Sequence, residues 1–153
     1  MSEQNSFKEI ISNRKALHNY EILDTFEAGI VLQGTEIKSL RQHEGSLQEA
    51  YIKVLNQELW IIGSHIPTYR FGNLHNHEER RDRKLLMHKK EIAKLQRATQ
   101  EKGLTLVPLS LYLKSGRAKI KLATARGKKL FDKREDLKKK DEQRTMQRIM
   151  KNY

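Results

Sequence analysis

Apolar and polar residues alternate over much of the chain, a pattern typical of short β-strands with one buried face. Residues 20–32 are rich in β-branched and aromatic side chains and predict a strand, with Gly29 marking a bulge or a close approach. Residues 49–66 predict two more strands around a turn at 56–58. Strands this short and this closely spaced favour a small β-barrel.

A second group of strands is predicted further along the chain. In residues 104–114 the apolar positions alternate, but their parity changes around Pro108. A strand accommodates such a change through a bulge or bend, which also suits a residue without an N–H to donate. A turn at 114–117 then leads into residues 118–123, whose alternate apolar residues are expected to face inward and whose two lysines outward.

One long segment has the periodicity of a helix instead. Residues 84–103 place Leu85, Ile92 and Leu95 on one face, and Gly103 is suited to the position just after a helix ends. We therefore predict a single helix across this segment.

The charge of the chain points to a partner. Lys and Arg number 31 among 153 residues, against 19 Asp and Glu, for a net charge of +12. Such an excess favours a polyanion, nucleic acid first and an anionic membrane second. Residues 126–153 hold 11 basic and 5 acidic residues, so half of the net charge lies in less than a fifth of the chain. This segment has few apolar residues to bury, and we expect it to be disordered when free and helical on an anionic partner.

The predicted fold is mainly β with helices: a small OB-fold-like β-barrel with two or more flanking helices and a basic C-terminal tail that is disordered when free. A short helix is expected within residues 33–45, and a polar, basic loop over 70–83. We divide the chain into a flexible N-terminal arm (1–12), an OB-like RNA-binding domain (13–125) and the basic tail (126–153).

The sequence contains little that indicates a catalytic or metal-binding site. The chain has no cysteine, and it lacks a Gly-rich phosphate loop, a nucleophile elbow and a zinc-protease helix. His75 and His77 form at most half a metal site, without a third ligand at a recognised spacing. We therefore expect neither an enzyme nor a cofactor. Five aromatic residues are candidates for stacking on RNA bases, although about half of such residues would simply fill a small barrel: Phe26, Tyr69, Phe71, Tyr112 and Phe131.

Several long stretches resemble the SsrA-binding protein (SmpB) family, the bacterial protein partners of tmRNA. They are "NRKALHNY" (13–20), "FEAGIVLQGTEIKSLR" (26–41), "RKLLMHKKEI" (83–92), "KGLTLVPLSLYLKSGRAKIKL" (102–122) and "ARGKKLFDKRE" (125–135). The resemblance implies a non-enzymatic adaptor that binds the tRNA-like domain of tmRNA and delivers it to stalled ribosomes. The tail would then occupy the decoding centre and the empty mRNA channel, where small-subunit ribosomal RNA surrounds it.

The resemblance also implies residues that contact tmRNA. Asn13, Glu27 and Leu86 match family positions associated with that interaction, and we expect Leu86 to pack beneath the RNA-facing surface. Because like charges repel, Glu27 would accept bonds from base or ribose donors, or orient a nearby Arg, rather than contact phosphate. The remaining candidates are basic residues able to neutralise phosphates or to donate to them: Arg14, Lys15, His18, Lys89 and Lys90.

In the tail, the resemblance implies contacts with the decoding centre and the mRNA channel. The candidates are Gly127, Lys128, Lys129, Phe131, Asp132, Lys133, Arg134, Lys138, Ile149 and Met150. Gly127 would let the chain turn from the last strand into the tail. Two positions depart from the family pattern: Phe131 stands where members usually carry Tyr or His, and Leu17 where a basic residue is common.

Two other functions remain open. A generic ribosome-associated OB-fold protein would have the same charge and fold, but it would not distinguish tmRNA from tRNA of similar size. A membrane-surface protein would also use a basic tail, but this tail has a small apolar face and no Trp. The first residues lack the order of a signal peptide and no apolar run approaches membrane-spanning length, so we expect a cytoplasmic monomer without membrane contact.

Overall fold

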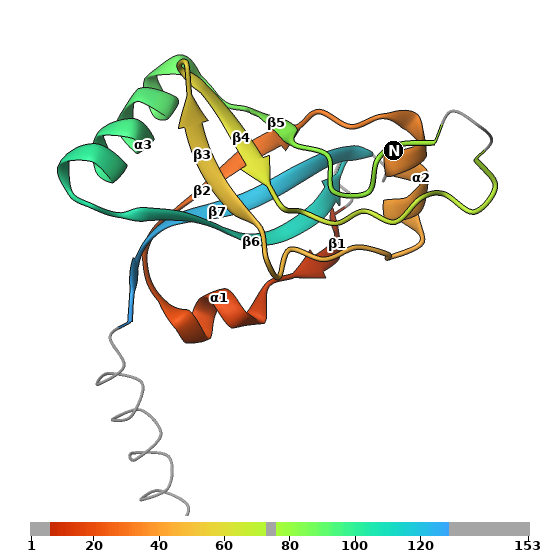
Figure 1. Ribbon diagram of the computed structural model, residues 1–153, viewed down its shortest axis with the longest axis horizontal. Helices are drawn as coiled ribbons and strands as arrows, with labels where there is room; N and C mark the ends of the chain where they lie inside the picture. The colour runs from red at the N-terminus through yellow and green to blue at the C-terminus, as the bar shows by residue number, and fades with distance from the viewer. Residues whose placement is uncertain (1–6, 73–75, 129–153) are drawn as a thin grey trace, which may run out of the picture.

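The computed structural model describes residues 7–72 and 76–128. Within them the chain forms seven strands and three helices (Figure 1). In chain order they are β1 (Phe7–Ser12), α1 (Arg14–Asn19), β2 (Tyr20–Ile30), α2 (Gly34–Arg41), β3 (Tyr51–Leu55), β4 (Glu58–Ile62), β5 (Arg83–Leu86), α3 (Lys89–Glu101), β6 (Thr105–Lys114) and β7 (Arg117–Gly127). The expectation of a mainly β fold with a few helices is confirmed.

The strands form one antiparallel sheet in the order β1-β6-β3-β4-β5-β2-β7. An additional pairing joins β6 to β7, so the pairings from β6 through β7 return to their starting strand. Closure removes the unpaired edges of these six strands, and β1 extends the sheet along the other side of β6. At the closing seam β3 meets β6 through the single pair Ile52–Leu106.

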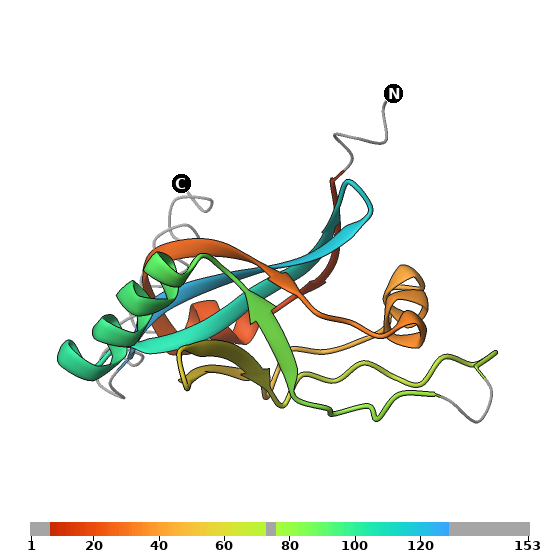
Figure 2. The same ribbon diagram turned by 90° about the horizontal axis from the view of Figure 1, so that it is seen from above.

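The helices lie at two ends of the sheet. Figures 1 and 2 show α1 and α3 at one end, near the last described residues of β7. At the opposite end lie α2 and the long connection between β4 and β5. A partner can therefore be bound at either of two separated ends or on the outer surface of the strands.

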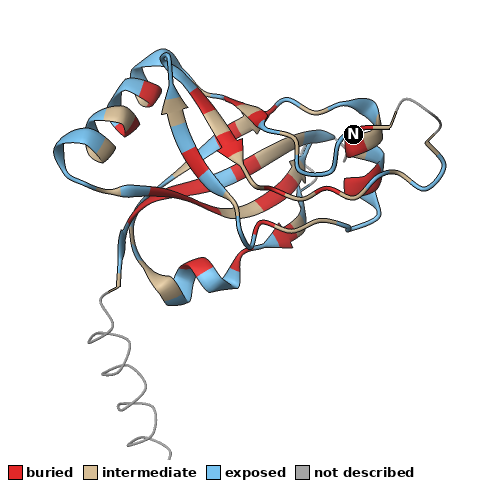
Figure 3. Cartoon of the chain, in the orientation of Figure 1, coloured by how far each residue is buried: buried red, intermediate tan, exposed pale blue. Residues whose placement is uncertain are grey.

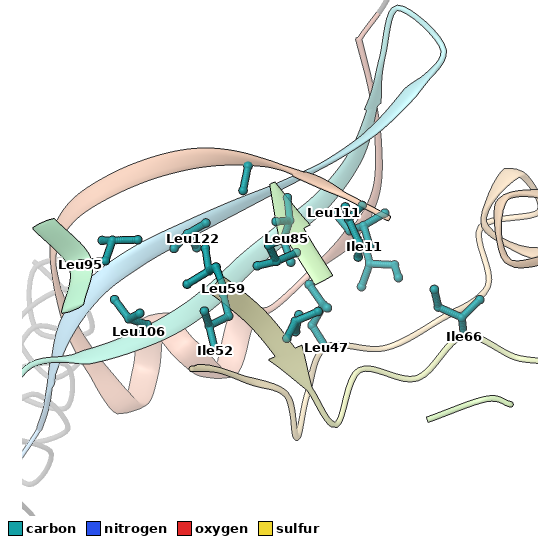
Figure 4. Close-up of a cluster of buried hydrophobic side chains, with 14 of the residues drawn as sticks. Ile11, Leu47, Ile52, Leu59, Ile66, Leu85, Leu95, Leu106, Leu111 and Leu122 are labelled. Atoms are coloured by element: carbon teal, nitrogen blue, oxygen red, sulfur yellow. The ribbon is translucent and has the colours of Figure 1, made fainter. Parts of the chain in front are cut away.

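The core fills the inside of the sheet, as the alternation of buried and exposed residues along the strands shows (Figure 3). Its side chains come from every strand of the closed set, and α3 adds Ile92 and Leu95. Figure 4 shows part of this cluster: Ile52, Leu59, Leu85, Leu106, Leu111 and Leu122. A second, smaller cluster of Ala16, Val107, Ala123 and Ala125 holds α1 against β6 and β7.

Two turns and one bulge follow the sequence expectations. Asn56 and Gln57 join β3 to β4 with φ of 50° and 65°, and Ser115 and Gly116 join β6 to β7 with φ of 52° and 77°. Two consecutive positive φ values give the mirror-image turn whose twist suits a hairpin. The pairing of β6 with β7 shifts register between Pro108 and Ser110, which confirms the predicted bulge.

The N-terminal boundary differs from the expectation. Residues 7–12, placed in a flexible arm, form β1 and pair with β6 from Phe7↔Lys114 to Ser12↔Ser110. Only Ile11 of this strand is buried, so its sequence has little apolar periodicity to reveal it. Residues 14–19, for which no helix was predicted, form α1 and bury Ala16 alone.

The single helix predicted over 84–103 is wrong at its start. Residues 83–86 form β5, which pairs with both β4 and β2, and α3 begins at Lys89. Leu85 is buried between Leu59 of β4 and Ile30 of β2. The end of the helix is as expected, because Gly103 follows it with φ of 65°.

The predicted tail begins within the sheet. Arg126 and Gly127 are the last residues of β7 and pair with Glu21 and Tyr20 of β2. The N–H of Lys128 donates to the carbonyl of Asn19, 2.9 Å away. Gly127 is therefore part of an extended strand, and the turn expected at this residue is absent from the described chain.

Candidate nucleic-acid interface

Glu27 and Leu86, two of the three motif positions, line one hollow on the outer surface. It lies between β2, β5, β7 and the start of α3, and its other lining residues are Gly29, Met87, His88, Glu91 and Lys119. Gly29 pairs with Leu86 on one side and with Lys119 on the other, so these three lining residues lie side by side on neighbouring strands. Leu86 is 53% exposed and so lies on the surface. The prediction that it packs beneath the surface is wrong.

The carboxylate of Glu27 is held by two side chains from β6. Tyr112 donates its hydroxyl to Oε2 at 2.5 Å, and the Nζ of Lys114 lies 3.6 Å from the same oxygen. The hydrogen bond from Tyr112 is the main cause that lowers the pKa of Glu27, and the charges of Lys114 and Lys119 add to it. Glu27 is therefore ionised and is oriented by a tyrosine and a lysine. The nearby Arg that Glu27 was suggested to orient is not among these partners.

Tyr112 is itself fixed in place. Its side chain is 4% exposed, and the ring of Phe7 packs on it with centroids 4.8 Å apart. Burial raises the pKa of Tyr112, and the neighbouring carboxylate of Glu27 raises it further, so the hydroxyl keeps its proton. No local sequence pattern indicates this pair, because 85 residues separate its members.

Asn13 occupies a different place. Its side chain is buried, and Nδ2 donates to the carbonyls of Pro108, at 2.9 Å, and Leu47, at 3.3 Å. Its backbone N–H donates to the carbonyl of Leu109 at 2.7 Å. Both amide protons are thus used inside the protein, and Asn13 ties the start of α1 to two other segments.

α1 carries three of the predicted contacts on its exposed side. Arg14, Lys15 and His18 are all exposed, and Arg14 and Lys15 line a second hollow together with Asn13. The lining of this hollow comes from residues 11–15 and 45–48 and shares no residue with the hollow at Glu27. The predicted tmRNA-binding residues therefore fall into two groups.

Lys89 and Lys90 are the first two residues of α3 and are exposed. The positive end of the helix dipole repels cations at this position, so neither lysine stabilises the helix it begins. An anionic ligand beside the Glu27 hollow would relieve that repulsion. Their placement next to His88, which lines the hollow, makes them suited to phosphate contact.

A buried ion pair ties the start of β5 to α2. Arg83 and Glu36 are both fully buried, and Arg83 Nε donates to Glu36 Oε2 at 2.5 Å. The other nitrogens of Arg83 donate to Ser64, Arg81 and Glu79, while Arg81 donates to the second carboxylate oxygen. Burial opposes ionisation of Glu36, but the bonds from Arg81 and the Gln33 N–H and the charge of Arg83 outweigh it, so its pKa is lowered.

Histidine 77 has a structural place in the protein. It is buried, with Nδ1 2.9 Å from the Thr35 hydroxyl and Nε2 2.8 Å from the Ile66 carbonyl oxygen. Both ring nitrogens are engaged, so neither is available to a metal. No group of three His, Asp or Glu side chains able to hold a metal occurs within residues 7–72 and 76–128.

The remaining predicted contacts lie outside the described residues, as does His75: Lys129, Phe131, Asp132, Lys133, Arg134, Lys138, Ile149 and Met150. Lys119 and His88 are interface candidates that the sequence analysis missed. The outward position of Lys119 in the 118–123 strand was the available signal.

Comparison with known proteins gives the family. The family model described as SmpB protein matches residues 10–152. The SsrA-binding protein of Protochlamydia amoebophila is 64% identical over 143 residues, 94% of either chain, and that of Chlamydia caviae is 53% identical over 148 residues, 97% of this chain and 99% of its own. A solved chain described by the words "tmRNA-SmpB: a journey to the center of the bacterial ribosome" shares 46% identity at a TM-score of 0.66, covering 78% of this chain and 84% of that one.

Across the described ranges, none of the helices is both long and apolar enough to span a bilayer. The family match reaches from β1 through every described element and beyond Lys128, and the relatives are similar over nearly their whole length. On this evidence the chain belongs to the SmpB family of SsrA-binding proteins.

Proposed function

We propose that this protein is a non-enzymatic adaptor of trans-translation. It binds the tRNA-like domain of tmRNA, delivers it to ribosomes stalled on messages without a stop codon, and so allows the unfinished peptide to be tagged. The observation that carries the proposal is its close similarity, over almost the whole chain, to proteins named for SsrA binding. The solved relative described with tmRNA and the bacterial ribosome supports the same pair of partners.

The surface around Glu27 supports this proposal physically. An oriented, ionised carboxylate beside an exposed Leu86 offers a base or ribose edge one acceptor and one apolar contact. Lys119 lines the same hollow, and the exposed Lys89 and Lys90 directly follow its lining residue His88. These three lysines would neutralise phosphates of the bound strand. Arg14, Lys15 and His18 on α1 would contact a second part of the RNA, with Asn13 acting through the position of the helix.

We further propose a division of labour between domain and tail. The closed ring of strand pairings supports an OB-type barrel as the tmRNA-binding domain. This domain begins at residue 7, because β1 pairs with β6 from Phe7 onward. The tail, from Lys128 onward, would enter the decoding centre and the empty mRNA channel and become helical there. The protein would work in the cytoplasm as a monomer, without a cofactor.

The alternative is a generic ribosome-associated RNA-binding protein. Its affinity would come from charge alone, and bulk tRNA would then compete as well as tmRNA.

A gel shift separates the two functions. The purified protein is titrated against the tRNA-like fragment of tmRNA at near-physiological salt, with excess bulk tRNA as competitor. Tight binding that survives the competitor supports shape-specific recognition. Ready displacement by tRNA would leave a generic basic RNA-binding protein.

A further inference from the structure

Phe71 is the most exposed large apolar side chain in the described chain, at 69%. It lies on the connection between β4 and β5, at the end of the molecule that also holds α2 (Figures 1 and 2). Tyr69 packs against it edge-on, with ring centroids 5.7 Å apart and an interplanar angle of 68°. A phenylalanine in this position contributes little to the core, and with the Tyr69 ring it forms an aromatic pair at the surface.

The turn that carries Phe71 is held by a side chain. Asn76 Nδ2 donates to the carbonyl of Tyr69 at 2.8 Å, and the N–H of Tyr69 donates to Asn76 Oδ1 at 3.1 Å. The Gly72 N–H also donates to the Tyr69 carbonyl, at 2.9 Å. A β-carbon at Gly72 would lie 2.6 Å from Asn76 Nδ2, so the close approach of this side chain requires glycine.

Asn76 is in turn anchored to the folded core. The next residue, His77, is buried and engages Thr35 of α2 and the carbonyl of Ile66. The exposed ring of Phe71 is therefore presented by a turn whose supports are buried. Such pre-organisation reduces the entropy lost when a ligand binds.

Two cations accompany the aromatic pair. The Nζ of Lys38 lies 5.6 Å from the centroid of the Tyr69 ring, and Arg70 Cζ lies 5.8 Å from that of Phe71. Among the described residues, neither cation has a carboxylate within ion-pair distance. Exposed aromatic rings flanked by uncompensated cations suit a ligand with π-faces and negative charge.

We propose that the aromatic turn, defined as Tyr69, Arg70 and Phe71 together with Lys38, binds an unpaired RNA base. The base stacks on Phe71, and Arg70 and Lys38 contact the flanking phosphates. The inference rests on the proposed function for its partner class, and it adds a third RNA contact to the Glu27 hollow and α1, at the end opposite α1 and α3. RNA is favoured over an acidic peptide because a base supplies an extended aromatic face for stacking, which the side chains of Asp and Glu lack.

A local fluorescence reporter tests the stacking. The double variant Trp60→Phe with Phe71→Trp leaves one indole, at the exposed position of the aromatic turn. Short single-stranded oligouridylate is added to the full-length variant, and heparin serves as a polyanion without bases. We expect quenching by the oligonucleotide that saturates, and no quenching by heparin at equal charge. Absence of quenching, or equal quenching by heparin, would overturn the proposal.

Affinity provides an independent test in the native background. Phe71→Ala is expected to weaken binding of a labelled oligouridylate by roughly fivefold or more, the lower range for one stacked base. Phe71→Tyr keeps a ring and should retain affinity, and Asn76→Ala should weaken binding by loosening the turn. An unchanged affinity of Phe71→Ala, with circular dichroism confirming its fold, would contradict the inference. Selective binding of the tRNA-like fragment is measured in the same preparations. Selective binding without stacking would contradict only this inference. Stacking without selective binding would contradict only the proposed function.

Discussion

The hydroxyl of Tyr112 donates to the carboxylate of Glu27 across strand β7, with 2.5 Å between the two oxygens. Tyr112 is buried and Glu27 is exposed. The hydrogen bond therefore restricts the orientation of a side chain in the candidate interface through a residue that is fixed in the core. Lys114, 3.6 Å from the same carboxylate oxygen, completes a small charged group that fixes how Glu27 meets a ligand.

Removing the hydroxyl with Tyr112→Phe should keep the fold and weaken RNA binding. The ring still packs on Phe7, so the free energy of unfolding should fall by only ~1 kcal/mol, the usual contribution of one hydrogen bond. Glu27 loses its fixed orientation, and affinity for the tRNA-like fragment should fall several-fold in a gel shift. The matched control is Tyr51→Phe, an exposed tyrosine on β3. If Tyr112→Phe binds like the native protein while Glu27→Ala does not, Tyr112 has no positioning role.

Breaking the buried ion pair should cost far more stability. Arg83→Met removes the fully buried one of the two arginines that pair with Glu36, for which we expect a loss of about 3–5 kcal/mol. The surface control is Arg80→Ala, whose partner Glu49 is exposed and 3.8 Å away, with an expected change under about 1 kcal/mol. Urea denaturation followed by circular dichroism compares the two. Similar losses in both variants would show that the pair does not support the fold.

The same pair predicts a direction for pH dependence. The pKa of Glu36 in the folded protein lies below its ordinary value of 4.5, so folding favours the ionised form. Its contribution to stability is therefore present above pH 4.5 and is lost as the pH falls through the lowered pKa. When the urea midpoint is measured at successively lower pH, it should decline below pH 4.5, where Glu36 becomes protonated in the unfolded chain first. Glu36→Gln should flatten the decline, and an equally steep decline in that variant would assign it to other groups.

Asn13 should act through structure more than through direct contact with RNA. Asn13→Ala leaves the carbonyls of Pro108 and Leu47 without their donor, at an expected cost of about 1–3 kcal/mol. RNA affinity should fall together with stability, and lowering the temperature should restore part of it. Arg14→Ala is the comparison: it should leave the unfolding free energy unchanged and reduce the salt dependence of binding. A stable Asn13→Ala with lost affinity would indicate direct contact.

Much of the sheet was predictable because local features specify it. The β3–β4 hairpin follows from two alternating strands and the turn at Asn56, and the bulge in β6 follows from the change of parity at Pro108. These signals lie within one or two elements, so no knowledge of the tertiary fold is needed to use them.

The errors occurred where a residue suits two structures. Leu85 fits the helical stripe of Ile92 and Leu95 as well as it fits a strand, and β5 has only four residues to show an alternation. Leu85 forms part of a strand because β5 pairs with β4 on one side and with β2 on the other. The pairs Glu36–Arg83 and Glu27–Tyr112 were equally hidden, because residues 47 and 85 positions apart meet only once the sheet has closed.

The proposed division between domain and tail predicts separate effects of truncation. Deleting the residues after Lys133 should leave affinity for the tRNA-like fragment largely intact, because the candidate interface lies before Lys128. The same deletion should abolish peptide tagging. A gel shift and a tagging assay on one preparation measure both, and a large loss of affinity would contradict the division.

Peptide tagging in a reconstituted system tests the central claim most directly. Ribosomes translate a message without a stop codon in the presence of charged tmRNA, with and without the purified protein, and tagged product is detected by its mass. We predict tagged peptide only when the protein is present, and a reduced yield with Glu27→Ala. Tagging that does not depend on the protein, or no tagging with it, would contradict its assignment as the adaptor.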